Sequence, residues 1–462
     1  MPSQPMSGSS LGGRRQNNLM VLELHVTLPS GRSQKISISE SSKVAELKIL
    51  AQRALDQQFL RLVTTDDRVL DPSEPLQTAE LQNGDHITAL SLKTNLVASG
   101  AAFAIWWCGC DGIIAWGDPE CGGHNSIVQD QLRSVQQVRA TWAAFAAILA
   151  DGCVVTWGHH RTGGDSSEVQ DQLRSVQQIQ ATWGAFAAIL ADETVVTWGN
   201  PSQGGDSSQV QHQLRNVQQL HGNARAFAAI LADRSVITWG DPLNGGDSST
   251  VQDQLRSVQQ IQATSPAFAA ILADGSIVTW GNASYGGDSS QVQHQLRNVR
   301  QVRATWAAFA AILADGCVVT WGHHRGGGDS SEVQDQLRSV QQIQATRGAF
   351  AAILADETVG TWGNPSEGGD SSQVQHQLRN VQKLQATQSA FAAILADGSI
   401  VTWGNASQGG DSSQVQHQLR NVQQVAATTQ AFAAILEDGS VVSWGCPGDG
   451  GDSSTVQDRI SL

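Results

Sequence analysis

The sequence of 462 residues has no long apolar run and little cysteine. Its longest apolar stretches, such as residues 226–232, are far too short to cross a bilayer, so we expect no membrane partner. Residues 1–18 are polar and contain no apolar segment, so we expect no signal peptide. Six cysteines in a chain of this length do not make a disulfide framework. We therefore expect reduced thiols and a cytoplasmic or nuclear location.

Motifs of catalysis and phosphate binding are also missing from the sequence. There is no Gly-Lys-Ser/Thr phosphate loop, and no nucleophile can be paired with a base. The net charge of −14 arises after residue 95, where 18 basic residues stand against 32 acidic ones. Such an acidic segment repels phosphate groups. We therefore predict a protein that is not an enzyme, needs no cofactor and does not bind nucleic acid.

The dominant feature that is present is a Trp-Gly pair, which returns every 41 residues. The nine tryptophans are Trp116, Trp157, Trp198, Trp239, Trp280, Trp321, Trp362, Trp403 and Trp444. A fixed period of this size indicates a repeat architecture. We assign residues 94–462 to nine repeats, residues 19–93 to a separate domain and residues 1–18 to a disordered tail.

Each repeat contains three runs of residues that favour β-structure. In one copy the runs are 258–264, 267–273 and 276–281, with an Asp274-Gly275 hairpin turn before the third. The following segment, 290–299, has apolar residues at helical spacing but could equally be an irregular outer strand. Short strands with one aromatic residue per unit predict a β-propeller-like array, with each period tryptophan buried between units. An open solenoid is the alternative to a closed ring.

The pattern Asp-Gly-x-Val-x-x-Trp-Gly, followed by Gly-Gly, resembles the repeat of the regulator of chromosome condensation family, which forms β-propellers. The resemblance covers about residues 95–462. Two departures bear on the number of blades. The family's units are generally longer than 41 residues, and its ring normally has seven blades. Similar propellers occur in large HECT-type (HERC-type) ubiquitin ligases and in a guanine nucleotide exchange factor.

The first domain shows a different order of elements. Alternating apolar residues predict strands at 22–28, 34–38, 59–63 and 86–92, and helical spacing predicts a helix over 43–55. This order resembles a ubiquitin-like domain, an α+β (β-grasp) fold. The segment lacks the terminal Gly-Gly of conjugating members, so the resemblance implies an integral domain that docks to partners. It also places a small apolar binding patch near Leu28, Val63 and Leu90, although these could be ordinary strand residues.

Two groups of polar residues are possible metal sites. The eight Gly-Gly-Asp-Ser-Ser loops could suggest calcium, but a glycine turn followed by a capping Asp or Ser explains the same residues. Cys108, Cys110, Cys121 and His124 come nearest to a zinc set, in the atypical first repeat. We predict no metal in either place.

Three further tryptophans mark a candidate surface. Trp142, Trp183 and Trp306 occupy one equivalent loop position, where other copies have Ala224, Ser265, Arg347, Gln388 or Thr429. Variable residues at a fixed position are how repeat scaffolds build a binding surface.

The leading functional hypothesis is a noncatalytic protein-binding adaptor that links a captured partner to the ubiquitin–proteasome system. Its expected partners are proteins, among them ubiquitin receptors or the proteasome. One alternative is a ubiquitin ligase component or a nucleotide exchange factor of the propeller family. Another is a recently amplified structural repeat protein.

Overall fold

The computed structural model describes residues 21–55, 60–66, 68–91, 94–107 and 112–453. The predicted tail, residues 1–18, lies outside the described residues. The chain divides into two compact units, residues 1–92 and residues 93–461, and each is treated by itself below. Both units are built mainly from β-strands, as predicted. None of the helices in the described part of the chain is long and apolar enough to span a membrane.

The first unit is a ubiquitin-like β-grasp, as its sequence predicts. It contains β1 (Val21–Thr27), β2 (Ser33–Ser39), α1 (Val44–Leu55), β3 (Leu60–Thr64) and β4 (His86–Ser91). The strand order is β2-β1-β4-β3, with β1 parallel to β4 and the other pairs antiparallel. Alternate residues of each strand join the buried side chains of α1, including Leu47 and Leu55, in one core. The helical and strand periods of the sequence therefore converge on the same interior.

The second unit contains nine three-stranded antiparallel sheets, counted over the described residues. The first strands are β5 (Thr94–Ala98), β8 (Val135–Ala140), β11 (Val176–Ala181), β14 (Val217–Gly222), β17 (Val258–Ala263), β20 (Val299–Ala304), β23 (Val340–Ala345), β26 (Val381–Ala386) and β29 (Val422–Ala427). The second strands are β6 (Ala102–Trp107), β9 (Ala144–Leu149), β12 (Ala185–Leu190), β15 (Ala226–Leu231), β18 (Ala267–Leu272), β21 (Ala308–Leu313), β24 (Ala349–Leu354), β27 (Ala390–Leu395) and β30 (Ala431–Leu436). The third strands are β7 (Ile113–Gly117), β10 (Val154–Gly158), β13 (Val195–Gly199), β16 (Val236–Gly240), β19 (Ile277–Gly281), β22 (Val318–Gly322), β25 (Val359–Gly363), β28 (Ile400–Gly404) and β31 (Val441–Gly445).

A short 3-10 turn follows the third strand of every sheet. These turns are η1 (Pro119–Cys121), η3 (His160–Thr162), η4 (Pro201–Gln203), η5 (Pro242–Asn244), η6 (Ala283–Tyr285), η7 (His324–Gly326), η9 (Pro365–Glu367), η10 (Ala406–Gln408) and η11 (Pro447–Asp449). The bend that leads into each turn needs a glycine at the end of the strand. Gly281, for example, has φ of +100°, and a β-carbon there would lie 2.7 Å from the carbonyl oxygen of Pro266.

In the eight repeats where it is described, the segment after the 3-10 turn forms neither an α-helix nor an outer strand. Residues 290–295 are turns, and only η2 (Ser126–Gln131) and η8 (Ser331–Val333) interrupt this pattern among the described repeats. The prediction of a helix or an outer strand was therefore wrong. Gln293 Nε2 donates to the carbonyl of Ile277 at 2.9 Å, so a side chain bonds to a group that an outer strand would use. Leu296 is nevertheless fully buried, which explains the apolar spacing.

The cores of the second unit lie between successive sheets. Trp280 is 2% exposed, stacks on Phe268 with ring centroids 5.2 Å apart, and donates from Nε1 to the carbonyl of Gly245 in the preceding repeat at 3.1 Å. The same cluster includes Ala226, Ala228, Ile230 and Val236 of the preceding repeat. The predicted burial of the period tryptophan between units is thus confirmed.

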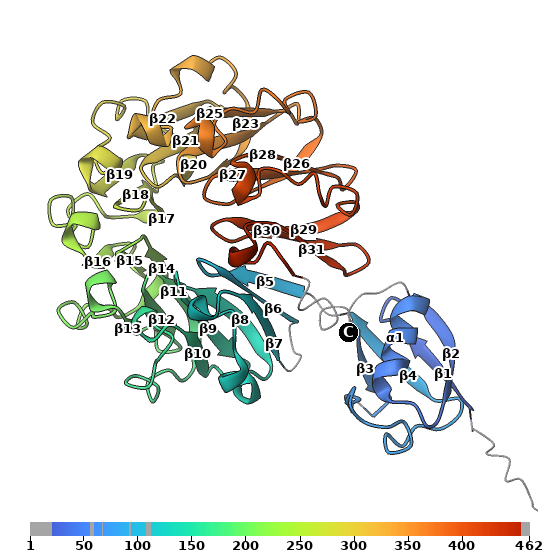
Figure 1. The fold of residues 1–462 in the computed structure, drawn as a ribbon. Helices are drawn as coiled ribbons and strands as arrows, with labels where there is room; N and C mark the ends of the chain where they lie inside the picture. The colour runs from blue at the N-terminus through green and yellow to red at the C-terminus, as the bar shows by residue number, and fades with distance from the viewer. Residues whose placement is uncertain (1–20, 56–59, 67, 92–93, 108–111, 454–462) are drawn as a thin grey trace, which may run out of the picture. The chain divides into compact units, whose positions relative to one another are not determined.

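The nine sheets close into a ring. A cluster of buried residues joins the first and last repeats, and its members are Phe103, Ile105, Trp116, Ala431, Ala433, Ile435 and Val441. These positions match those that join every other pair of neighbours, and β29 packs beside β5. Figure 1 shows the red strands β29–β31 of the last repeat next to the strands β5–β7 of the first repeat. The open solenoid is therefore excluded, and each sheet is a blade of three strands.

Candidate protein-binding surfaces

One residue from each blade forms a closed ring of hydrogen bonds, which we call the hub ring. Its members are Gly100, Trp142, Trp183, Ala224, Ser265, Trp306, Arg347, Gln388 and Thr429, each in the loop between the first and second strands of its blade. The backbone N–H of each of the first eight donates to the carbonyl of the next, with distances from 2.7 to 3.3 Å. The hydroxyl of Thr429 donates to the carbonyl of Gly100 and completes the ring. The loop position that varies in sequence is therefore fixed in its backbone.

All members of the hub ring except Gly100 and Thr429 line a hollow of about 810 Å³, which we call the aromatic hollow. Trp142, Trp183 and Trp306, the three candidates from the sequence, all line it. Trp142 and Trp183 are 44% and 48% exposed, whereas Trp280 and the other period tryptophans are 5% exposed or less. The structure thus brings the three predicted residues to one surface and separates their role from that of the buried tryptophans.

The aromatic rings of the hollow form two clusters. Trp142 and Trp183 lie 6.2 Å apart between ring centroids. Tyr285, from η6, lies 5.1 Å from Trp306, and both contact the ring of His323 at 5.7 and 6.3 Å. Trp183 and Trp306 are separated by three repeats, so the clusters lie about a third of a turn apart around the hub ring.

Among the residues that the structure describes, the charged residues that line the aromatic hollow are Arg225 and Arg347. The guanidinium carbon of Arg347 lies 5.4 Å from the ring centroid of Trp306, a cation–π arrangement. Arg225 lies 3.7 Å from a carboxylate oxygen of Asp241. Burial raises the pKa of Glu367, and the charge of Arg347 opposes that rise. Two guanidinium groups therefore line the hollow, each with a carboxylate near it, on a ring that is acidic overall.

Tyr285 and Arg225 line the hollow but were not predicted as site residues from the sequence. Tyr285 lies in a 3-10 turn 21 residues after Thr264, and its carbonyl oxygen accepts a hydrogen bond from the Thr264 hydroxyl. This bond holds the turn, and with it the tyrosine ring, beside the hub ring. The one available signal was composition, because Tyr285 is the single tyrosine of the chain.

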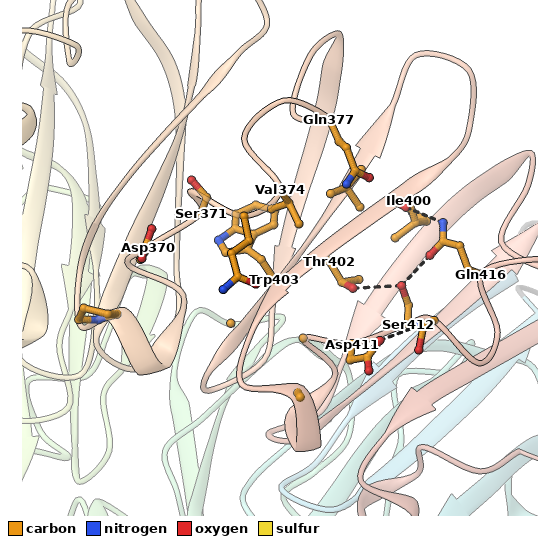
Figure 2. A pocket seen from close by; sticks show the side chains of 17 residues that line it. Asp370, Ser371, Val374, Gln377, Ile400, Thr402, Trp403, Asp411, Ser412 and Gln416 are labelled. Atoms are coloured by element: carbon orange, nitrogen blue, oxygen red, sulfur yellow. Dashed lines mark hydrogen bonds between the residues drawn. The ribbon is translucent and has the colours of Figure 1, made fainter.

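Polar grooves between neighbouring blades are a second kind of hollow. Figure 2 shows one of about 650 Å³, between the turn segments that contain Asp370 and Asp411. Ser412 shares a hydrogen bond of 3.0 Å with Thr402 and donates to Gln416 at 2.7 Å, and Gln416 donates to the carbonyl of Ile400 at 2.9 Å. Equivalent residues line grooves at two other junctions. Because their polar side chains bond to one another, these grooves follow from the repeat and do not single out a ligand.

The aspartates of the Gly-Gly-Asp-Ser-Ser loops act as turn caps. Asp288 Oδ1, for example, accepts a hydrogen bond of 2.9 Å from the backbone N–H of Ser290. This backbone hydrogen bond, with a further one from the Ser290 hydroxyl, lowers the pKa of Asp288. Within the described residues there is no group of three or more His, Cys, Asp or Glu side chains that could hold a metal ion.

The residues considered for zinc are only partly described. Cys108 and Cys110 lie outside the described residues. Cys121 is a buried free thiol, and burial, with the nearby charge of Asp118, raises its pKa to about 11. His124 shares a hydrogen bond of 2.7 Å with the hydroxyl of Ser126. Neither described residue carries the features of a metal ligand.

The patch expected on the ubiquitin-like unit is divided by the sheet. Leu90 pairs with Arg61 across β3 and β4, so Leu90, Arg61 and Val63 share the outer face, opposite the core. Leu90 is 38% exposed, whereas Val63 is 9% exposed and bridges to Val69. Leu28 is 8% exposed and belongs to the core cluster, so the structure does not place it with the other two.

The outer face of that sheet has further surface groups. His25 of β1 and His86 of β4 stack with ring centroids 4.9 Å apart, and Val69 is 49% exposed. We refer to Val63, Val69 and Leu90 as the outer-face patch. It is a small apolar area, in contrast to the deeper aromatic hollow of the ring.

The geometry identifies both parts of the chain by fold. One is a ubiquitin-like β-grasp, and the other is a closed, β-propeller-like ring of three-stranded blades. The sequence matches no protein-family model, and no curated protein matches it. Among solved structures, Prp20p from Saccharomyces cerevisiae is similar at 14% sequence identity, with a TM-score of 0.40 over 79% of this chain and 96% of Prp20p. Yeast RCC1 (Prp20) bound to Kap60 is similar at 15% identity, with a TM-score of 0.34 over 55% of this chain and 73% of that one.

A third solved structure is similar to the N-terminal part alone. The UBL domain of Plasmodium falciparum Dsk2 shows 18% identity and a TM-score of 0.15, over 15% of this chain and 97% of that domain. Identities at this level concern the fold, and no partner of those proteins is transferred to this chain.

Proposed function

We propose that this protein is a noncatalytic adaptor, in which the ring captures a protein and the ubiquitin-like unit docks to ubiquitin receptors or the proteasome. The observation that carries the proposal is the aromatic hollow. Two tryptophans that are nearly half exposed stand on a backbone fixed by the hub ring. Tryptophan and arginine dominate the energetics of protein interfaces, because they bury a large area at few rotatable bonds or make several hydrogen bonds.

The ubiquitin-like unit supports the second half of the proposal. Its outer-face patch is apolar and small, so binding through it should be weak, since little free energy remains after the entropy of association is met. The resemblance of the repeats to the propellers of HECT-type ubiquitin ligases adds a reason to look for both partners in the ubiquitin system. The proposal implies a cytoplasmic or nuclear location, where ubiquitin receptors are found.

The test compares the proteins that bind to the full chain with the proteins that bind to residues 95–462. We expect proteasomal ubiquitin receptors to bind the full chain only, and a second protein to bind both forms. Purified ubiquitin receptors should then be titrated against the full chain directly. If no receptor binds the full chain up to high micromolar concentration, the link to the ubiquitin system is wrong. If no protein binds residues 95–462, the ring is not a capture module.

A further inference from the structure

We infer that the aromatic hollow binds an extended acidic peptide, which inserts two large apolar side chains and pairs its carboxylates with Arg225 and Arg347. The inference rests on the proposed function, because it names the chemistry of the protein segment that the ring captures. It follows from three properties of the hollow: two separated aromatic clusters, two lining guanidinium groups that make no hydrogen bond within the described residues, and side-chain amides whose N–H groups make none there either.

The two aromatic clusters determine how many apolar side chains the ligand inserts. Trp142 with Trp183, and Tyr285 with Trp306, lie on different sides of the hub ring. The remaining sector has Gln388, Thr429 and Gly100, which offer no aromatic surface. A ligand with one apolar group would cover one cluster and leave the other in water. An extended chain with two apolar side chains covers both, and burial of each adds to the affinity.

The two arginines set the charge of the ligand. One follows each aromatic cluster around the ring: Arg225 after Trp183, and Arg347 after Trp306. No hydrogen bond joins either guanidinium to another residue in the described part of the chain. Each has one carboxylate in its neighbourhood: Asp241 stands 3.7 Å from Arg225, and the charge of Arg347 acts on Glu367. A guanidinium binds a carboxylate with two parallel hydrogen bonds. An acidic residue next to each apolar anchor therefore matches the hollow.

Amide side chains at the edge of the hollow suit a peptide backbone. Asn200 and Asn282 line the hollow, and their Oδ1 atoms accept hydrogen bonds from the backbone N–H groups of Ser202 and Ser284. Their Nδ2 groups make no hydrogen bond within the described residues, so they can donate to the carbonyls of a bound chain. Single-stranded nucleic acid would also stack on the tryptophans, but it carries a charge at every nucleotide, whereas two arginines line the hollow.

The test uses synthetic fluorescein-labelled peptides with two Asp-Phe pairs joined by Gly-Ser spacers of increasing length. The full chain is titrated into each peptide at physiological salt, and fluorescence anisotropy is measured. We expect binding at one or more spacer lengths. Replacing both Asp with Lys, or one Phe with Gly, should weaken binding by about tenfold or more. A labelled thymidine oligonucleotide serves as the competing ligand class, and tighter binding to it than to every peptide would overturn the inference.

Matched variants of the protein locate the site. Trp183→Ala and Arg347→Gln should each weaken peptide binding by about tenfold. Ile127→Ala and Arg174→Gln, which change exposed residues that do not line the hollow, should leave it unchanged. Thermal melting of each variant checks that the ring stays folded, which we expect because Trp183 is half exposed. Equal binding by all four variants would place the peptide elsewhere and overturn the inference.

The failure of this inference can be told from failure of the proposed function. If no peptide binds but Trp183→Ala abolishes capture of a protein by the full chain, the hollow is a capture site and its ligand chemistry is wrong. If no peptide binds, and the full chain either captures no protein or captures it equally well with Trp183→Ala, then the hollow is not a capture site. Both results reject the acidic peptide.

Discussion

Phe103 and Gly450 lie at opposite ends of the repeat array and meet where the ring closes. A β-carbon at Gly450 would overlap the Phe103 ring, as one at Gly245 would lie 2.7 Å from the ring of Phe268. The packing at the closing junction is therefore the same as at the other junctions between blades. It lacks one hydrogen bond, however. Trp280 and seven other period tryptophans donate to a glycine carbonyl of the preceding repeat, whereas Nε1 of Trp116 is buried with no partner among the described residues.

This difference makes the closing junction less sensitive to loss of the indole N–H. Trp116→Phe and Trp280→Phe remove similar volumes, but only Trp280→Phe leaves a buried carbonyl without its donor. We expect Trp280→Phe to lower the free energy of unfolding by about 1–2 kcal/mol more than Trp116→Phe does. Urea denaturation of the two variants measures the difference. Equal losses would mean that the hydrogen bond from the period tryptophan contributes nothing.

Truncation of a period tryptophan should be far more costly. Trp280 is 2% exposed and fills the space between two blades, so Trp280→Ala leaves a cavity in a core that cannot collapse freely. We expect a loss of about 3–5 kcal/mol in the free energy of unfolding. Trp183→Ala is the matched control, because the same residue type is 48% exposed there. A similar loss in both variants would contradict the separation between buried and surface tryptophans.

Three hairpin turns hold a residue other than glycine in a left-handed conformation. Arg234 has φ of +68°, and it stands where Gly275 of the next repeat has φ of +75°. Because a β-carbon is strained in this region, Arg234→Gly should raise the free energy of unfolding by about 1 kcal/mol. Gly275→Ala should lower it, since the new β-carbon would lie 2.9 Å from Cα of Asn298. Unfolding curves of both variants check the opposite signs, and destabilisation by Arg234→Gly would refute the argument.

The capping aspartates make the ring sensitive to acid. Backbone hydrogen bonds lower the pKa of Asp206, Asp288 and Asp411 in the folded state. A lowered pKa in the folded state stabilises the fold at pH values above the ordinary aspartate pKa of about 3.9. That contribution is lost as the pH falls below this value through the lower folded pKa. We therefore expect the melting temperature to be level near neutral pH and to drop below about pH 4.

A single substitution tests the assignment of this acid sensitivity. Asp288→Asn keeps an oxygen that accepts the hydrogen bond from Ser290 but removes the titrating carboxyl. The variant should lose less stability than the wild type between pH 5 and pH 3, measured as the urea midpoint at each pH. An identical pH dependence would show that this carboxyl does not contribute.

The outer-face patch is best tested at its exposed leucine. Leu90→Asp places a charge at a side chain that is 38% exposed, and it should abolish binding to purified ubiquitin receptors while the domain stays folded. Val63 is nearly buried, so a charge there would disturb the fold as well. Leu50→Asp is the control, because Leu50 is 37% exposed on α1 and lies away from that face. Equal binding by both variants and the wild type would remove the patch from the proposal.

Much of the fold follows from local sequence. The 41-residue period locates every blade, and Asp-Gly turns locate many of the hairpins. Alternation of apolar residues locates β1–β4, and helical spacing locates α1. These signals are local because a turn or a strand face depends on residues a few positions apart. Burial of Trp280 could be predicted for the same reason, since a large aromatic residue present in every unit must be covered by a neighbouring unit.

Other features were decided only by the tertiary structure. The 41-residue period does not determine whether nine blades close into a ring. Closure depends on a small rotation between neighbouring blades, which accumulates around the array. Leu28 lies just after β1, and its burial with the core instead of the outer-face patch is set by tertiary packing. Tyr285 and Trp306 come from different blades, so no spacing in the sequence predicts their contact. The sequence by itself determined the blades and their buried tryptophans, while the ring determined which variable side chains share one hollow.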